Sequence, residues 1–423
     1  MAREFKDSGI EWIGQIPKEW KVELIGNNIK EINDKNDDSS EDNALQFKMG
    51  TIISKKGGDS KYNPESLVAY TKVKEGDIVI NGLNLSFDFI SQRVGLVREK
   101  GVITSTYLTL RPSSLLYSRF VNYLFKAYDN CKAFHGMGRG LRQILAYREL
   151  KNQKLIYPAL PEQQKIADYL DKVCGEVDEM VALQEKMIEE LKAYKQSVIT
   201  EAVTKGLNPN VPMKDSGIDW IGEIPEHWSV DKVVRLFRTI GSGTTPNSSD
   251  NDAFHGTINW IQSGDINGGV LRNSKNKISE ETLAKYSVLT VYKAPFIIVA
   301  MYGASVGNIS ISQIDGCVNQ ACCVLSDSNI NFLYAFYAIK AAQRYLIYRA
   351  VGGGQPNISQ NTLKHLWIAK PPIEEQQQIA SYLDTKCSEI DSLIAIKQQK
   401  IEELKEYKKS IIYEYVTGKK EVA

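Results

Sequence analysis

Two loops gather small polar side chains of the kind that hydrogen-bond to nucleic acid bases. GSGTTPNSS occupies Gly241–Ser249 and VGGGQPNIS occupies Val351–Ser359. Asn and Gln suit the adenine edge, and hydroxyls and backbone amides suit phosphates. Neither loop is a Walker A loop, since no Gly-Lys-Ser/Thr follows, and neither fits GxGxxG between a strand and a helix. Ordinary turns remain the alternative interpretation. The candidate contact residues here are Ser242, Thr244, Thr245, Gln355 and Asn357.

A second set of candidates lies in the first 160 residues and is richer in Arg and Lys, which suit guanine and phosphates. Arg139 and Arg142 occupy the position that corresponds to Gly352–Gln355, so this loop could contact DNA in both halves of the chain. The full set of candidates is Lys55, Lys56, Asn81, Asn84, Arg93, Arg139 and Arg142.

No catalytic or metal-binding motif accompanies these loops. The four histidines occur singly, and the sequence has no HExxH, no NPP[FY] and no convincing PD…ExK. Two Glu-x-Lys triplets, Glu190–Lys192 and Glu403–Lys405, fall in expected helices, where residues two apart do not face each other. We therefore expect no catalytic centre and no metal site.

The composition is that of an ordinary globular protein. Of the 423 residues, 43% are hydrophobic and 24% are charged, and no run reaches the roughly 18 apolar residues of a membrane helix. The first residues do not form a signal peptide. Six cysteines are too few and too irregularly spaced for a disulfide framework or a zinc site. We expect six reduced, buried thiols and a cytoplasmic protein.

The elements that must position the loops come in duplicate. KDSGIEWIGQIPKEWKV at Lys6–Val22 returns as KDSGIDWIGEIPEHWSV at Lys214–Val230, with 12 of 17 positions identical. We call these two segments the opening blocks. Gln163–Thr204 returns as Gln376–Thr417, with 23 of 42 positions identical. Between the repeats, the two variable regions, about residues 23–160 and 231–373, have almost no sequence similarity. The repeated segments therefore flank two different domains.

The longer repeat predicts two long helices that pair as an antiparallel coiled coil. Each begins near a proline and carboxylates and ends at a glycine, Gly206 or Gly418. Apolar residues recur at alternating steps of four and three, with Gln184 as a polar interruption in the first helix and lysines in the second. Packing of each helix on its own domain is the alternative. The expected packing residues are Ile166, Leu170, Val173, Val177, Met180, Leu191 and Tyr194, then Ile379, Leu383, Ile390, Leu393, Leu404 and Tyr407.

The predicted fold class is α+β, with two globular domains separated by the two helices in a nearly circular, pseudo-twofold arrangement. β-branched runs and glycine punctuation predict strands, including a buried one around Phe296–Met301, and helices near Tyr117–Cys131 and Asn331–Arg349. The tryptophans of the opening blocks should seat each domain against a helix end. The expected segments are residues 1–160, 161–206, 207–373 and 374–423.

The charge distribution points to a polyanionic partner, although scattered solvated charge is the alternative. Residues 1–160 carry 24 basic and 19 acidic residues, and residues 207–373 carry 14 and 12. Residues 81–160 alone carry 12 basic and 4 acidic residues. The excess of positive charge therefore lies in the globular domains.

Several motifs together resemble the specificity subunits of type I restriction–modification enzymes. They are the WIGxIPxxW blocks, GTINWIQSGDING, VAMYGASVGN, VNQACC, GGGQPNIS and the P-P-x-x-E-Q-Q that opens a long helix. The resemblance covers nearly the whole chain and is closer in the second domain, since RGLRQILAYREL replaces the Gly/Gln/Asn loop in the first. Within these motifs the further candidate DNA contacts are Ser263, Asp265, Tyr302, Ser305, Asn319 and Gln320.

The resemblance implies a double-stranded DNA-binding subunit without catalytic activity of its own. Each domain would read one half of a bipartite site, and the helices would carry two methyltransferase subunits and, through them, translocase/nuclease subunits. S-adenosylmethionine, ATP and Mg²⁺ would belong to those partners. Two other hypotheses are a stand-alone nuclease or methyltransferase and a coiled-coil scaffold that joins two protein-binding domains.

Overall fold

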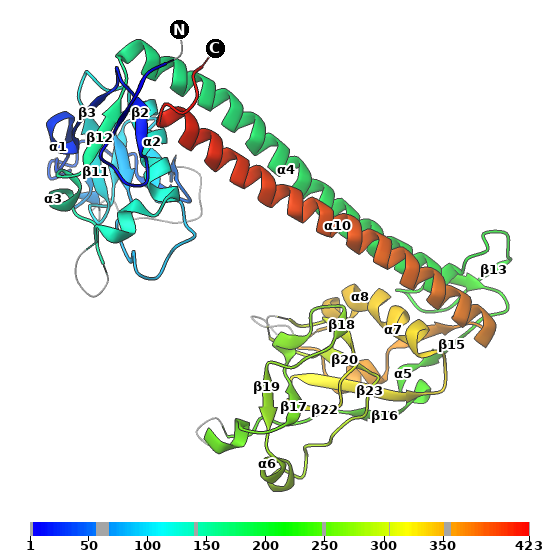
Figure 1. Ribbon diagram of the computed structural model, residues 1–423. Helices are drawn as coiled ribbons and strands as arrows, with labels where there is room; N and C mark the ends of the chain where they lie inside the picture. Colours follow the sequence, from blue (N-terminus) through cyan, green and yellow to red (C-terminus); the bar gives the residue numbers. More distant parts are fainter. Residues whose placement is uncertain are drawn as a thin grey trace. The chain divides into compact units, whose positions relative to one another are not determined.

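The computed structural model describes residues 3–55, 67–138, 143–247, 251–303, 305–350 and 357–422. The chain divides into two compact units, which we call unit 1 (residues 1–185 and 398–423) and unit 2 (residues 186–397). Each unit combines a β-rich domain with part of both long helices, α4 (Leu160–Lys205) and α10 (Ile373–Val416) (Figure 1). The fold class predicted from the sequence is confirmed.

The domain of unit 1 is built on a four-stranded sheet of order β4-β11-β8-β9, and four two-stranded pairs surround it: β1-β2, β3-β12, β5-β6 and β7-β10. Its strands are β1 (Phe5–Asp7), β2 (Gln15–Pro17), β3 (Lys21–Leu24), β4 (Ile29–Glu31), β5 (Leu45–Lys48), β6 (Thr51–Ser54), β7 (Thr71–Val73), β8 (Ile78–Ile80), β9 (Val94–Leu96), β10 (Gly101–Ile103), β11 (Leu108–Pro112) and β12 (Lys154–Tyr157). Its helices are α1 (Ile25–Asn28), α2 (Ser118–Asn130) and α3 (Tyr147–Leu150).

The domain of unit 2 has a five-stranded sheet of order β16-β23-β20-β21-β18 and a three-stranded sheet of order β19-β17-β22, with the pairs β13-β14 and β15-β24. Its strands are β13 (Met213–Asp215), β14 (Glu223–Pro225), β15 (Ser229–Lys232), β16 (Phe237–Gly241), β17 (Ile258–Ile261), β18 (Val270–Leu271), β19 (Asn276–Ile278), β20 (Phe296–Ala300), β21 (Ile309–Ser312), β22 (Gly316–Val318), β23 (Cys322–Ser328) and β24 (Trp367–Lys370). Its helices are α5 (Val233–Leu236), α6 (Glu280–Lys285), α7 (Phe332–Ala341), α8 (Gln343–Tyr348) and α9 (Gln360–Lys364).

Each domain contains a sheet with the same strand arrangement, although the sequences of the two domains are dissimilar. The order β4-β11-β8-β9 in unit 1 matches β16-β23-β20-β21 in unit 2, and every neighbouring pair in both runs is antiparallel. The pairs β3-β12 and β15-β24 correspond in the same way. Duplication therefore extends through the sheets, whereas sequence identity is limited to the opening blocks and the long helices.

Most elements expected from the sequence are present. Helix α2 coincides with the prediction near Tyr117–Cys131, and the apolar run at Phe296–Met301 forms the fully buried strand β20. The single helix expected over Asn331–Arg349 is instead two, α7 and α8. They are separated at Ala342, where a ψ of 0° turns the backbone away from helical geometry.

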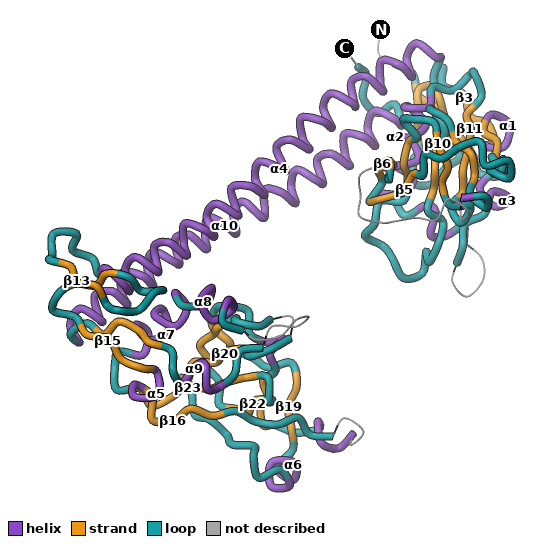
Figure 2. Tube along the Cα trace, turned by 180° about the vertical axis from the view of Figure 1, so that it is seen from behind, coloured by secondary structure: helices purple, strands orange, loops and turns teal. Residues whose placement is uncertain are grey.

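Helices α4 and α10 lie side by side and run antiparallel within each unit (Figures 1 and 2). In unit 1 the rings of Tyr169 and Tyr415 are 4.5 Å apart, and Asp178 pairs with Lys408. In unit 2 Lys195 pairs with Asp391. Since the partner's number falls as the α4 number rises, the two chains run in opposite directions. Of the helices that the structure describes, none has an apolar stretch suited to crossing a membrane.

A buried tryptophan fastens each domain to the ends of both long helices. In unit 1 the Trp20 indole nitrogen donates to Glu162 of α4 at 3.2 Å, and the ring packs beside Gly418, just after α10. In unit 2 the Trp228 indole nitrogen donates to Glu375 of α10 at 2.9 Å, and the ring packs beside Gly206, just after α4. We call each such set a helix-end clamp.

The clamp glycines have φ of 77° at Gly206 and 70° at Gly418, a conformation that favours glycine at the residue after a helix. Both tryptophans are 1% exposed. The expected packing role of these two residues and the expected glycine ends of the helices are therefore confirmed.

The two ends of the chain meet in unit 1. The Arg3 guanidinium contacts carboxylates of Glu19, Glu162 and Glu421, at 2.6, 2.7 and 3.1 Å. Near the C-terminus, the ammonium group of Lys419 donates to the carbonyl of Ile13 at 2.9 Å. The prediction that the C-terminus stands beside the first opening block, as the end of α4 stands beside the second, is confirmed.

The buried stripe on the long helices differs from the predicted one at one position in each heptad. Residues 166, 170, 177, 379, 383, 390 and 404 are buried as expected, and Leu191 is partly buried. The prediction is wrong for four side chains that are about half exposed, and Val173 is only partly buried. The four are Met180, Tyr194, Leu393 and Tyr407, at 50, 52, 48 and 52% exposed.

The side chains that face the other helix at these points lie one residue later than predicted. They are Cys174, Val181, Ile188 and Lys195 in α4 and Cys387, Ile394, Ile401 and Lys408 in α10. The error has a physical cause, because adjacent residues such as Met180 and Val181 are both apolar. A lysine then occupies the fourth inward position of each helix. Lysine buries its aliphatic stem while its ammonium group reaches water or a carboxylate.

The two inward lysines form equivalent ion pairs. The Lys195 ammonium lies 2.6 Å from Asp391, and the Lys408 ammonium lies 2.6 Å from Asp178. Each lysine side chain is mostly buried, at 16 and 29% exposed. The pairs relate by the same 213-residue offset as the helix repeat. The repeat therefore conserves a contact, and this contact favours the antiparallel arrangement.

All six cysteines are free thiols, and five are buried. The expectation was wrong for Cys131, which is exposed just after the end of α2. Cys174 and Cys387 occupy equivalent inward positions on the long helices. Burial raises the pKa of both thiols. They therefore act as small apolar side chains in the helix packing.

A pair of isoleucines in the same unit and helix tests the revised stripe. We expect Ile390→Ala, at 3% exposed, to lower the free energy of unfolding by about 2–5 kcal/mol, because it removes buried methyl groups and leaves a cavity. Ile396→Ala, at 63% exposed, should change it by less than about 0.5 kcal/mol. Urea unfolding monitored by circular dichroism measures both, and equal losses would contradict the stripe.

Candidate nucleic-acid interface

The candidate residues of unit 2 follow the ends of four strands, two in each of its two larger sheets. Strands β16 and β20 both pair antiparallel with β23, so they run in the same direction, and β17 runs parallel to β22. Ser242 follows β16, Ser263 and Asp265 follow β17, Tyr302 and Ser305 follow β20, and Asn319 and Gln320 follow β22. The structure therefore brings together segments that are up to 80 residues apart.

Hydrogen bonds join these loops to one another. The Ser305 hydroxyl donates to the carbonyl of Ser263 at 2.7 Å. The Ser242 hydroxyl donates to the carbonyl of Cys322 at 2.7 Å, and Thr245 bonds to the side-chain oxygen of Gln320. The loop set is thus a connected surface rather than separate turns.

Close backbone packing supports the same loops from below. A Cβ at Gly243 would overlap the carbonyl of Val318, so only glycine fits where these two segments cross. The buried indole of Trp260 donates to the carbonyl of Thr244 at 3.2 Å. The GSGTT sequence is therefore shaped by packing against β22 and β17.

Some of the candidates hold their own loop. The Asp265 carboxylate accepts the backbone N–H of Gln262 at 2.9 Å, and the Asn319 side-chain oxygen accepts that of Ala321 at 3.1 Å. Thr245, Gln320 and Asn357 are the exposed members, and the other described candidates are partly buried. Gln355 lies outside the described residues. Asn357 adjoins the set through Ile358, whose N–H donates to the carbonyl of Met301 at 2.7 Å.

The matching position in unit 1 is the loop between β8 and β9, Asn81–Arg93. It corresponds to the Met301–Asn308 loop between β20 and β21, because both loops join the third and fourth strands of the shared sheet. Asn81 is partly buried and Asn84 is exposed, so the structure brings these two candidates to one loop. Lys55 is placed elsewhere, with its ammonium group 5.8 Å from the ring of Tyr70. Lys56, Arg139 and Arg142 lie outside the described residues.

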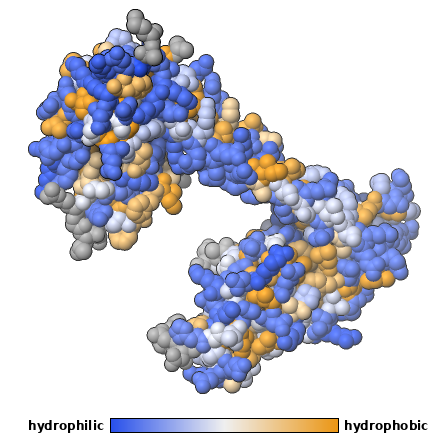
Figure 3. Space-filling model, in the orientation of Figure 1, coloured by the Kyte–Doolittle hydropathy of each residue, from blue (hydrophilic) through white to orange (hydrophobic). Residues whose placement is uncertain are grey.

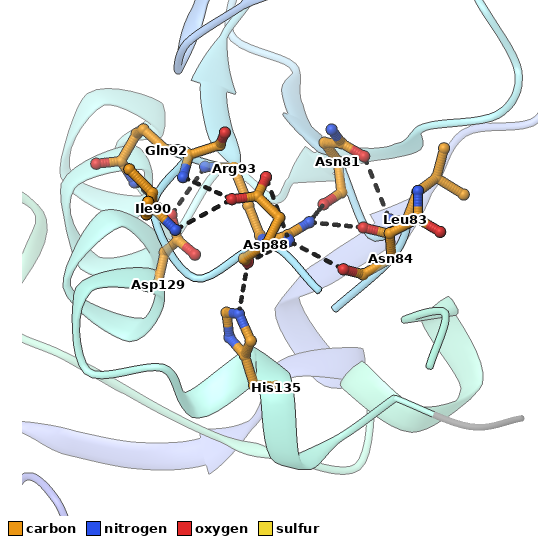
Figure 4. A network of polar contacts seen from close by, with 10 residues as sticks. Asn81, Leu83, Asn84, Asp88, Ile90, Gln92, Arg93, Asp129 and His135 are labelled. Atoms are coloured by element: carbon orange, nitrogen blue, oxygen red, sulfur yellow. Dashed lines mark hydrogen bonds and ion pairs between the residues drawn. The ribbon is translucent and has the colours of Figure 1, made fainter. Parts of the chain in front are cut away.

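The structure corrects the expectation for Arg93. Its side chain is 1% exposed and cannot reach a DNA groove from this position. Instead, the guanidinium donates to the backbone carbonyls of its own loop, as Figure 4 shows. The accepting carbonyls belong to Asn81, Leu83, Asn84 and Asp88, at 3.0, 2.7, 3.5 and 2.7 Å. Arg93 is therefore the anchor of the loop rather than a contact residue.

Two carboxylates and a histidine complete this anchor (Figure 4). Asp88 accepts the backbone N–H groups of Ser91 and Ile90, at 2.9 and 3.0 Å, and these bonds lower the pKa of Asp88 to about 2. Asp129 of α2 accepts the backbone N–H of Arg93 at 2.8 Å, although burial raises the pKa of that carboxyl. His135 lies 3.0 Å from the carbonyl of Asp88. The loop is thus tied to α2 and the turn after it.

Sequence reasoning missed three side chains on this loop. Phe87, Phe89 and Ile90 are 78, 55 and 91% exposed, although they are among the most apolar residues in the chain. The sequence feature that could have identified them is the apolar run FDFI, which is flanked by Asn, Ser and Gln. Its apolar residues follow neither the spacing of a strand nor that of a helix, so burial in such an element does not explain them. Within the described ranges, no three His, Cys, Asp or Glu side chains are grouped to hold a metal.

Comparison with known proteins identifies the family of the chain. Residues 74–193 and 225–406 match the model of the type I restriction modification DNA specificity domain, one match in each half of the duplicated chain. The chain belongs to this family. It is therefore a DNA specificity subunit of a type I restriction–modification system. This subunit is one part of the enzyme complex, and the subunit is not catalytic by itself. The resemblance drawn from the sequence motifs is confirmed.

Two relatives from Methanocaldococcus jannaschii match over almost their whole length. The putative type I restriction enzyme MjaX specificity subunit is 26% identical over 96% of this chain and 95% of its own. The type I restriction enzyme MjaVIII specificity subunit is 24% identical over 96% and 94%. A solved structure of a type I restriction–modification system, concerned with complex assembly and conformational transition, covers 95% of this chain and 99% of its own with a TM-score of 0.70. At 15% identity, this last likeness shows a shared fold.

A pair of arginines tests the anchor in unit 1. We expect Arg93→Ala to lower the free energy of unfolding by about 3–5 kcal/mol. The change removes the cationic partner of the loop carbonyls and of the Asp88 carboxylate, which lies 3.6 Å from the guanidinium. Arg98→Ala, at an exposed position five residues later, should have an effect of less than about 0.5 kcal/mol. Urea denaturation measures both variants. Indistinguishable midpoints would show that Arg93 is not the anchor.

Proposed function

We propose that this specificity subunit reads a bipartite duplex site, with one half contacted by residues 1–160 and the other by residues 207–373. The helices at residues 161–206 and 374–423 act as the spacer between the two readers. The observation that supports this most is the duplicated helix-end clamp. Trp20 with Glu162 and Trp228 with Glu375 attach two different domains to equivalent helix ends.

The contents of the two domains fit two different half-sites. Around the matching run of four strands, unit 2 offers hydroxyl and amide side chains such as Thr245 and Gln320, whereas unit 1 offers Asn81, Asn84 and an apolar loop tip. Hydroxyls and amides bond to base edges and phosphates. We propose the described unit 2 candidates together with Gln355, and Lys55, Lys56, Asn81, Asn84, Arg139 and Arg142 in unit 1, as DNA contacts.

We propose two methyltransferase subunits as direct partners, because the repeated helices offer two equivalent surfaces for one kind of protein. Translocase/nuclease subunits would join through them. S-adenosylmethionine, ATP and Mg²⁺ would be bound by these partners, and methylation of an adenine would require the methyltransferase to flip the base. The specificity subunit would work in the cytoplasm together with them.

Exchange of one domain tests the assignment of half-sites. The complex of this chain with its methyltransferase subunits should methylate adenines in a single bipartite motif of the genome. Replacing residues 231–373 with the corresponding domain of an unrelated specificity subunit should change one half of the motif and keep the other, because the clamps and helices are unchanged. Sequencing that detects methylated adenine reads both motifs. A motif that keeps both halves after the exchange would refute the assignment.

Lengthening the helices tests the spacer. Seven residues inserted after Lys186 and seven after Gln399 keep the heptad repeat in both helices and add roughly 10 Å at about 1.5 Å per residue. The unread gap should grow by about three base pairs at 3.4 Å each, with both half-sites kept. The same methylation mapping measures the gap.

A matched control inserts the seven residues after Lys186 alone, which offsets one helix against the other. That variant should lose methylation or assembly, because Lys195 and Asp391 no longer meet. A double insertion that methylates the original motif with its original gap would contradict the spacer role.

A further inference from the structure

The loop tip of unit 1 exposes three apolar side chains. Ile90 is 91% exposed and Phe87 78%, and Phe89 between them is 55% exposed. The hairpin tip at Met49, 65% exposed, lies next to this loop, since Gly50 packs against Gln92. The surface seen in Figure 3 is mostly hydrophilic. An apolar cluster on such a surface marks a site of interaction.

This loop tip is held in one conformation. Arg93 ties four of its carbonyls from below, and Asp88 caps the N–H groups of Ile90 and Ser91. The ring of Phe89 stacks on His135 with centroids 4.7 Å apart and an interplanar angle of 22°. The hydrogen-bonding groups of the loop are therefore largely used internally, and Phe87 and Ile90 project from a rigid base. Rigid presentation lowers the entropic cost of binding.

Charge and position favour duplex DNA as the occupant. Residues 81–160 carry 12 basic and only 4 acidic residues, and three of those four are engaged within the domain: Asp88, Asp129 and Glu149. The loop also occupies the place on the shared sheet that the Met301–Asn308 loop occupies in unit 2. The positive charge of this region suits the phosphates of duplex DNA, and the exposed apolar side chains suit its stacked bases.

We propose that Phe87 and Ile90 form an apolar wedge that enters the half-site read by unit 1 and partly unstacks one base step. Side chains such as Phe and Ile are used in this way by proteins that kink duplex DNA. The sequence preference would come from the step, because pyrimidine–purine steps unstack most easily. Unit 1 would then read by deformation as well as by hydrogen bonds. The inference rests on the proposed two-reader function.

The first measurement asks what the tip touches. The photoreactive residue p-benzoylphenylalanine is placed at position 90 of the full chain, in complex with its methyltransferase subunits, and irradiated with sheared genomic DNA. We expect a DNA adduct at position 90 and none at position 115, where Leu115 is equally apolar and 55% exposed in the same domain. Adducts to a methyltransferase subunit, or no adduct, overturn the proposal.

The second measurement asks whether a step is unstacked. In a duplex that carries the mapped motif, 2-aminopurine replaces one base at a time in the unit 1 half-site, since its fluorescence rises when stacking is lost. The wild-type complex should raise fluorescence at one step at least threefold. Phe87→Ser with Ile90→Ser should abolish this rise and weaken duplex binding at least tenfold, whereas Leu115→Ser should do neither.

Two further outcomes are decisive. A DNA adduct at position 90 without any fluorescence rise means contact without a wedge, and the proposal is then wrong. Failure of the two-reader function is a separate result, seen as the absence of a bipartite methylated motif in the genome. In that case the duplex for the fluorescence test is the fragment recovered from the crosslink, and a rise at its crosslinked step still decides the wedge. Thermal melting of the double variant should match that of the wild type, because the replaced side chains are exposed.

Discussion

The packing of α4 against α10 is the interaction on which the rest of the molecule depends. Each unit takes the beginning of one helix and the end of the other into its core, with Ile166 and Ile412 in unit 1 and Val203 and Ile379 in unit 2. A domain therefore has no complete core without both helices. The same helices also carry the equivalent pairs Lys195–Asp391 and Lys408–Asp178. These contacts define which faces meet and in which direction.

Attached to the two long helices, the two domains use the same strand arrangement to support two different surfaces. The strands of order β4-β11-β8-β9 and β16-β23-β20-β21 fix where loops emerge, and the loops decide what is presented. In unit 2 the loops from four strand ends bond to one another and present hydroxyl and amide groups. In unit 1 a single loop is organised around a buried arginine and presents apolar side chains. The units differ most in their loops, whereas the strands and helices that support these loops are arranged alike in both.

The frame could be predicted from the sequence, because repetition and heptad spacing are local signals. The opening blocks, both long helices and the contact of the two chain ends all follow from residues that recur. One feature of the frame needed the structure. The inward position of Lys195 instead of Tyr194 depends on a carboxylate of the other helix, and the helical period alone does not separate adjacent residues.

The site was harder to predict than the frame for a similar reason. Arg93 has the composition of a DNA contact, yet four carbonyls of its own loop surround it. Whether an arginine faces out or in depends on the path of a loop without periodicity, and no pattern of residue types encodes this path. The grouping of Ser242, Ser263 and Ser305 likewise depends on strand order, which their dissimilar sequences do not reveal.

The closure of the frame at the helix-end clamps has an evolutionary consequence. The residues of the two clamps belong to segments that recur in both halves, so homologous recombination can cross over within these segments and keep the clamp contacts. A new reader then arrives with its attachment already compatible. Such a protein can diversify its target by shuffling whole domains between genes, faster than point mutations in the loops would permit.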